Sequence, residues 1–362
     1  MEVQQQEMKS LGVFDIYREA YKIILSRRKI FTQITFALIL PLSFISLAHT
    51  LLSNTLFPKI TDQNQKDLAE TQVPNSNYAN IFDLLSSISA SYWLLQAAYT
   101  IFSFILYLLS TSAIVYTMAC IYSGREVTFK LVMSVVPKVW KRLMVTSFTI
   151  FLALCTYHVV AFLVLLALVA VLIAFGPNTN VGLVILSVVV VLYLMGFLYM
   201  SIVWQLASTI SVLEDSCGFQ AMKKSNQLIR GKVGMATFIF LKLGLVYYML
   251  HKALERVVLQ GEPLGMVNRV AFANVCLSLL SLLSLFERVI QTVIYFVCKS
   301  HHHENIDKLA LSDHLQVYTQ DYYIPLKGDN LQLKQFYVGW ALVIKVVICC
   351  SSRLLLFNYG SV

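Results

Sequence analysis

The sequence predicts an all-α protein, a polytopic integral membrane bundle of about six transmembrane helices with amphipathic interfacial helices. Three observations predict it. The 362 residues are 58% hydrophobic and 13% charged, with a mean hydropathy of +0.70, which is too apolar to cover a globular surface with polar groups. The whole stretch from Leu143 to Leu213 contains no Asp, Glu, Lys or Arg. Basic residues are also divided unevenly between successive loops, as in chains that cross a bilayer.

The elements follow in order from the hydropathy. Residues 1–29 form a predicted cytosolic amphipathic segment, because apolar residues recur every three or four positions from Leu11. A membrane domain over residues 30–298 comes next. A helix needs about 20 apolar residues to cross the bilayer, and six segments qualify: 30–52, 92–122, 143–175, 181–207, 235–258 and 270–297. Pro41 should kink the first span, and the turn residues from Gly176 to Asn180 should join the third and fourth spans as a hairpin.

Two segments follow the last span. Residues 299–335 are a predicted cytosolic tail, and residues 336–362 are an apolar C-terminal extension that Lys345 and Arg353 interrupt. The extension is open to three interpretations: a seventh span, an interfacial helix or a gene-model extension.

The basic residues predict the orientation. Six precede residue 30, five lie at 123–142, four at 214–234 and four at 299–335, against five in the alternate loops. Because Lys and Arg accumulate in cytosolic loops, we expect both termini in the cytosol. The first 29 residues lack a cleavable signal, so the first span is expected to anchor the chain in the endoplasmic reticulum or plasma membrane. No disulfide framework is expected from the seven cysteines.

Anionic membrane lipids are the predicted partners of the basic loops. Residues from Phe129 to Leu143 alternate apolar and basic positions like a surface helix. The predicted headgroup contacts are Lys138, Lys141, Arg142, Lys223, Lys224 and Arg230. The alternative is that these charges only connect and orient the spans.

The segment from Leu213 to Lys232 reads as a short capped helix. Asp215 or Ser216 can cap its N-terminus, and Gly231 can end it in the left-handed conformation. Phe219, Met222 and Ile229 would share a face toward lipid. In the alternative, functional interpretation, the basic residues bind headgroups or a partner protein while Glu214 holds the helix against the bundle.

Seven residues of this segment resemble a signature of multi-pass proteins related to the membrane domain of bacterial glycerophosphoryl diester phosphodiesterases: Glu214, Gly218, Ala221, Lys224, Ser225, Leu228 and Gly231. Residues 116–129, 135–143 and 296–307 resemble a plant family of uncharacterised transmembrane proteins, some labelled polyadenylate-binding-protein-binding. The resemblance covers most of residues 10–337. It implies a membrane bundle with no agreed activity and without the phosphodiesterase's soluble catalytic barrel.

Two charges within the spans are the other candidate site. Counted along the helices from the cytosolic side, Lys242 lies about 15 Å deep and Glu287 about 18 Å deep. An isolated charge in hydrocarbon is costly, so we expect an intramembrane pair between Lys242 and Glu287, with Arg288, Gln291 and Gln205 near it. A solute or proton site lined by these residues is the alternative.

Catalytic and metal chemistry have little support. His301, His302 and His303 are successive and do not share a helix face, so no metal site or cofactor is expected. His158 is expected to be a hydrogen-bonded interior residue. No nucleophile, phosphate-binding or dinucleotide motif appears.

These observations favour a non-enzymatic membrane protein that organises lipids or partner proteins. A small-solute transporter and a membrane-embedded lipid-handling enzyme are the alternatives. Nucleic acid is not an expected partner, because the net charge of +9 reflects the asymmetry of the loops.

Overall fold

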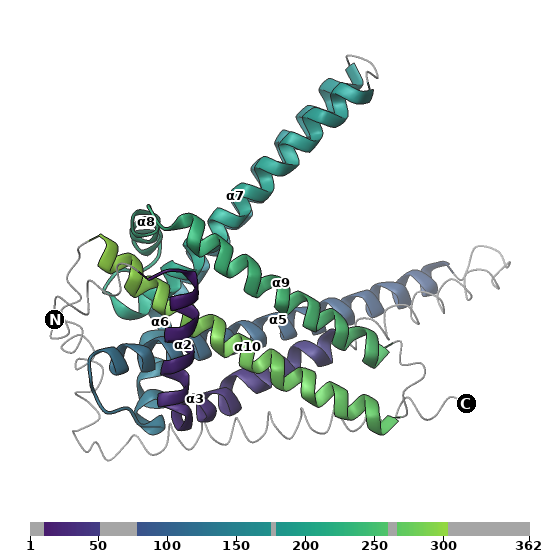
Figure 1. Ribbon diagram of the computed structural model, residues 1–362. Coiled ribbons are helices and arrows are strands. Elements are labelled where there is room, and N and C mark those ends of the chain that lie inside the picture. The colour runs from purple at the N-terminus through teal and green to yellow at the C-terminus, as the bar shows by residue number, and fades with distance from the viewer. Residues whose placement is uncertain (1–10, 51–77, 175–178, 260–265, 303–362) are drawn as a thin grey trace. The chain divides into compact units, whose positions relative to one another are not determined.

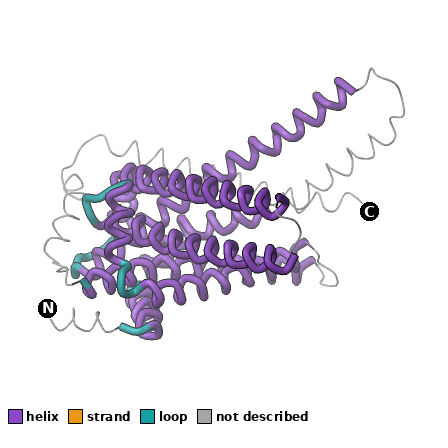
Figure 2. The backbone as a smooth tube through the Cα atoms, turned by 90° about the horizontal axis from the view of Figure 1, so that it is seen from above, coloured by secondary structure: helices purple, strands orange, loops and turns teal. Residues whose placement is uncertain are grey.

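The computed structural model describes residues 11–50, 78–174, 179–259 and 266–302, and all regular secondary structure in these ranges is helical (Figure 2). The all-α fold is therefore confirmed. Within these ranges, six helices are long and apolar enough to cross a bilayer: Arg28–Thr50, Leu94–Tyr122, Phe129–Leu172, Val184–Leu213, Val233–Val257 and Asn268–His301. The six predicted spans match these in number and order. The extension at 336–362 and most of the predicted tail lie outside the described residues.

The N-terminal helices carry the first irregularity. Helix α2 (Val13–Ser26) buries Ile16, Ala20 and Ile23 on one face. Helix α3 (Arg28–Ile34) runs into a π-helical turn, η1 (Thr35–Ile39), where the Leu40 N–H donates to the Thr35 carbonyl. This wide turn lies just before Pro41, whose missing N–H interrupts the α-helical pattern.

Helices α6 (Phe129–Ala174) and α7 (Thr179–Leu213) are longer than the predicted spans and pack against each other. The expected separate surface helix at 129–143 is wrong, because α6 is continuous through Pro137. Its buried residues form one stripe that runs on from the basic stretch into the span: Val132, Val135, Val136, Val139, Leu143 and Ile150. Packing along this stripe keeps the two segments in one helix.

In the described residues, α5 (Tyr78–Tyr122) and the α6–α7 pair are followed by three more helices: α8 (Phe219–Leu228), α9 (Val233–Leu259) and α10 (Met266–His301). Figure 1 shows α8 as a short helix between the end of α7 and the start of α9. Because it connects two membrane-spanning helices, α8 lies at a membrane surface.

The chain divides into two compact units. The first comprises Met1–Gln33, Leu108–Val246 and Leu285–Tyr322, and the second comprises Ile34–Tyr107, Tyr247–Ser284 and Tyr323–Val362. In the first unit, residues 108–120 of α5 and 288–298 of α10 are buried on every face. The Tyr122 and Phe296 rings lie 4.4 Å apart there. Two buried hydroxyls in α5, those of Ser112 and Thr117, donate to the Leu108 and Ala113 carbonyls of their own helix, whereas the buried Tyr122 hydroxyl has no hydrogen-bond partner among the described residues.

The second unit has its own apolar cluster of Leu254, Cys276 and Leu280, with Leu47 packed against it. His49 stacks on Tyr99 with 3.8 Å between ring centroids. The His49 Nε2 lies 2.5 Å from Gln96 Oε1. These contacts tie the end of the first span to α5.

Candidate functional site

The candidate site surrounds α8 and lies entirely within the first unit. Gly218 occupies the N-cap of α8 with φ +60°, and its N–H donates to Thr146 Oγ1 at 2.9 Å. The predicted caps, Asp215 and Ser216, are therefore wrong. Asp215 lies too early in the turn and instead pairs with Arg142 at 2.6 Å. Both contacts fix the beginning of α8 on α6.

The buried face of α8 consists of three residues of the sequence signature, Ala221, Ser225 and Leu228. The Ser225 hydroxyl donates to the Val203 carbonyl at 2.8 Å, which docks α8 on α7. The predicted lipid-facing set is only partly right. Phe219 is 73% exposed, but Ile229 is fully buried because α8 ends at Leu228 and the chain turns inward.

The prediction for the end of α8 is partly right, because the helix already ends at Leu228 with Ile229 as its C-cap, and Gly231 lies in the turn that follows. Gly231 has φ +90°, the left-handed conformation expected of it. A Cβ at this position would lie 2.9 Å from His301 Nε2, so the turn also needs the missing side chain to pass close to the end of α10.

Glu214, the first residue after α7, accepts three hydrogen bonds. Its Oε2 lies 2.6 Å from Lys224 Nζ of α8. Its Oε1 accepts from Lys299 Nζ at 2.7 Å and from the Tyr295 hydroxyl at 2.6 Å, both in α10. One carboxylate, 13% exposed, thus ties together α7, α8 and α10.

The environment of Glu214 favours its ionised form. Burial raises the pKa of this carboxyl, but the hydrogen bonds from Lys224, Lys299 and Tyr295 outweigh burial and lower the pKa below the ordinary 4.5. Glu214 is therefore a permanent anion at neutral pH, and it balances two lysines.

The six predicted headgroup contacts fall into two groups. Arg142 and Lys224 pair with Asp215 and Glu214 and hold the α8 segment in place. Among the described residues, three of the other cations are exposed and form no ion pair: Lys141, Lys223 and Arg230. Lys138 is exposed as well. The exposed group carries the charge that an external anion would meet.

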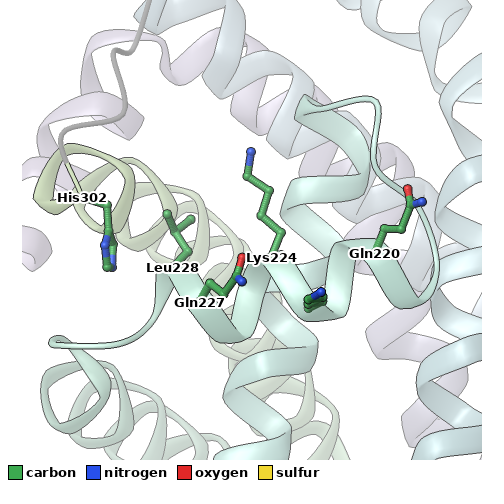
Figure 3. Close-up of a pocket in the computed structure, with 6 residues that line it drawn as sticks. Gln220, Lys224, Gln227, Leu228 and His302 are labelled. Atoms are coloured by element: carbon green, nitrogen blue, oxygen red, sulfur yellow. The ribbon is translucent and has the colours of Figure 1, made fainter.

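A pocket of about 580 Å³ opens beside α8, as Figure 3 shows. It is lined by Gln220, Lys223, Lys224, Gln227, Leu228 and His302. The first five belong to α8, and His302 directly follows α10. The His302 Nε2 lies 3.2 Å from the Arg230 carbonyl. Since a carbonyl only accepts hydrogen bonds, Nε2 carries the proton. The pocket therefore joins cations to hydrogen-bonding groups at one membrane surface.

The predicted Lys242–Glu287 pair is not formed. In the described part of the chain neither residue takes part in an ion pair or hydrogen bond with the other, and Lys242 is exposed on α9 while Glu287 is half-buried next to Arg288. Counting residues predicts similar depths for the two side chains, but in the described structure they differ in burial and form no pair with each other. Gln291 does meet Gln205: it donates to the Gln205 carbonyl at 2.5 Å and to Thr209 Oγ1 at 3.0 Å.

The histidines show no metal geometry. Among the described residues no group of three His, Cys, Asp or Glu side chains could hold a metal ion; His303 lies outside them. His158 is exposed rather than interior, but it is hydrogen-bonded as expected, with Nδ1 3.0 Å from the Tyr193 hydroxyl.

Sequence reasoning missed several residues of the site, namely Tyr295, Lys299, Thr146, Gln220, Gln227 and the contact of His302. Tyr295 and Lys299 are one turn apart at the end of α10. That spacing predicts a shared helix face, but a single sequence does not indicate that this face meets Glu214, 81 residues away.

Residues 1–336 match a family model described as a domain of unknown function (DUF8558). The curated proteins and the solved structures contain no match to this chain. The comparisons thus show the family alone, and the function has to be argued from the site.

Proposed function

We propose that this member of the DUF8558 family is a non-enzymatic membrane protein that gathers anionic lipids at its cytosolic face. One observation carries the proposal: three exposed cations form no internal ion pair within the described residues. Lys223 and Arg230 lie between the candidate spans Val184–Leu213 and Val233–Val257, and Lys141 lies just before the uncharged part of α6 that begins at Leu143. Each such cation near an anionic surface contributes about 1 kcal/mol to lipid binding.

The apolar neighbours of these cations support the same role. Phe219, one turn before Lys223, is largely exposed at the membrane surface. Helix α2 exposes Phe14, Tyr21 and Leu25 beside the basic residues Arg18 and Lys22. Mixed apolar and basic surfaces are typical of amphipathic helices that lie among lipid headgroups.

Location and orientation belong to the proposal. Both termini and α8 lie in the cytosol, with the protein in the endoplasmic reticulum or plasma membrane. The distribution of basic residues between alternate loops supports this orientation, and anionic lipids are abundant on cytosolic leaflets.

The test is a triple variant, Lys141→Gln, Lys223→Gln and Arg230→Gln, compared with the unchanged protein. We expect the triple variant to retain at least about tenfold less anionic lipid, because three contributions of about 1 kcal/mol are removed. Lipids that co-purify with the protein would be quantified by mass spectrometry.

A control removes three cations near the helix ends that the predicted topology places on the opposite side of the membrane, Lys252→Gln and Arg256→Gln in α9 and Arg269→Gln in α10; of these, Lys252 is paired with Glu255. This control should keep its anionic lipid. Equal lipid profiles for the two triple variants would contradict the proposal and leave the basic residues with a role in orientation alone.

A further inference from the structure

We propose that the pocket beside α8 binds a phosphate that carries neighbouring hydroxyls, such as a phosphoinositol headgroup, and that this phosphate competes with Glu214 for Lys224. The inference rests on the proposed function. It specifies the class of ligand that the same site binds and how ligand binding changes the contacts between the helices.

The cations of the pocket favour an oxyanion. Lys223 is exposed and, in the part of the chain that the structure describes, makes no ion pair. Lys224 follows it directly and lines the same pocket (Figure 3). Two lysines that line one pocket provide several charge-assisted hydrogen-bond donors, which suit a phosphate.

The remaining pocket groups favour hydroxyls. Gln220 and Gln227 lie two turns apart on α8, on either side of the two lysines. A carboxamide both donates and accepts, so it can pair with a hydroxyl in either direction. In His302, Nε2 donates to the Arg230 carbonyl, and Nδ1 remains for a hydrogen bond with a hydroxyl, which can either donate or accept. A serine headgroup would instead bring its ammonium group toward two lysines.

Lys224 links the pocket to the bundle. Its Nζ lies 2.6 Å from Glu214 Oε2, and its side chain is 35% exposed on the pocket side. A phosphate that draws Lys224 away leaves Glu214 hydrogen-bonded to Lys299 and Tyr295, so the carboxylate keeps two hydrogen-bonding partners. Ligand binding therefore weakens the tie between α7 and α8 while the tie to α10 remains.

The competition predicts opposite effects on affinity and stability. Glu214→Gln should bind the phosphate about fivefold more tightly, because Lys224 is released, and yet unfold at a lower temperature. Lys223→Met should weaken binding about fivefold without loss of thermal stability. Asp215→Asn removes a neighbouring carboxylate whose partner, Arg142, does not line the pocket, so it should leave the affinity unchanged.

The experiment titrates full-length protein in a neutral detergent with dioctanoyl phosphatidylinositol and with dioctanoyl phosphatidylserine, which carry the same net charge. Inositol 1-phosphate is the soluble probe. We expect tighter binding of the phosphatidylinositol than of the phosphatidylserine. Tighter binding of the phosphatidylinositol than of inositol 1-phosphate would assign the ligand to the membrane, and equal binding would assign it to a free polyol phosphate. Both outcomes support a pocket that recognises a phosphate with neighbouring hydroxyls.

Equal affinities for the two lipids, or a Glu214→Gln variant that does not bind more tightly, would overturn the inference while the proposed function stands. Failure of the purified protein to retain any anionic lipid would overturn the proposed function instead. If Glu214→Gln does not fold, Lys299→Met tests the same competition with the opposite sign, since Glu214 would then hold Lys224 more strongly and binding would weaken.

Discussion

Gly218 sets the position of α8 through a backbone that other residues rarely adopt. Its φ of +60° and ψ of −129° lie in a region open to glycine, because a side chain there meets the neighbouring peptide groups. An added Cβ would also lie 3.2 Å from Thr149 Oγ1. A glycine at position 218 therefore allows its N–H to reach Thr146 on α6, which is a physical reason for the glycine at this position of the signature.

We expect Gly218→Ala to destabilise the protein by about 1–3 kcal/mol, the usual cost of such a backbone conformation in a residue with a side chain. Gly234→Ala in α9 is the matched control, since no atom lies within 4 Å of its added Cβ and alanine favours a helix. Thermal unfolding in detergent measures both. A melting temperature for Gly218→Ala equal to that of the control would contradict this account of the N-cap.

Residues that act through their own backbone or helix face were the most predictable part of the site. Gly231 was assigned its left-handed conformation from the sequence, and the structure has it at φ +90°. Partners from distant segments were not predictable. Lys242 and Glu287 illustrate the reason, because counting residues gives the depth of a side chain in the membrane but not its direction around the helix. Tyr295 and Lys299 were missed for the same reason.

Among the elements, the α6–α7 hairpin is too long for an upright crossing. The uncharged part of α6 from Leu143 is about 48 Å long and α7 about 52 Å, against about 30 Å of hydrocarbon. Side chains along both helices are exposed and apolar: Val159, Leu163, Val169, Val184, Val188 and Leu192. An upright hairpin would leave such residues in water at its tip. An inclination of about 50° would keep them in lipid, although it exceeds the usual tilt.

We expect Val169→Cys to be protected from a water-soluble maleimide in nanodiscs, where both membrane faces meet water. Val169 lies about 39 Å along α6 from Leu143, beyond the hydrocarbon if the helix were upright. The native Cys155 and Cys217 are both exposed side chains and serve as internal controls, one within the span and one at the α8 surface. Labelling would be assigned to each site by mass spectrometry. Modification of Val169→Cys to the level of Cys217 would show an upright hairpin.

At the level of the whole molecule, the number and order of the spans within the described residues followed from the sequence, because hydrophobic length is a property of the chain in one dimension. The boundaries were less accurate. The pattern of the basic stretch before Leu143 predicts a surface helix, yet a buried stripe makes this stretch and the third span one continuous helix, α6. Continuity of a helix depends on what its buried face meets, which the charge pattern does not encode.

The orientation of the whole molecule can be tested with two single substitutions that create glycosylation acceptors. Lys66→Thr places a threonine two residues after Asn64, in the loop between the first two spans, and Val317→Asn places an asparagine two residues before Thr319, beyond the last span. Both positions lie outside the described residues. Because nineteen basic residues lie on the side of the termini and five on the other, we expect Lys66→Thr to be glycosylated and Val317→Asn to remain bare. Glycosidase-sensitive gel shifts in cell membranes would measure the glycosylation of both variants. Modification of Val317→Asn alone would place α8 and its pocket in the lumen, away from the cytosolic anionic lipids that the proposed function requires.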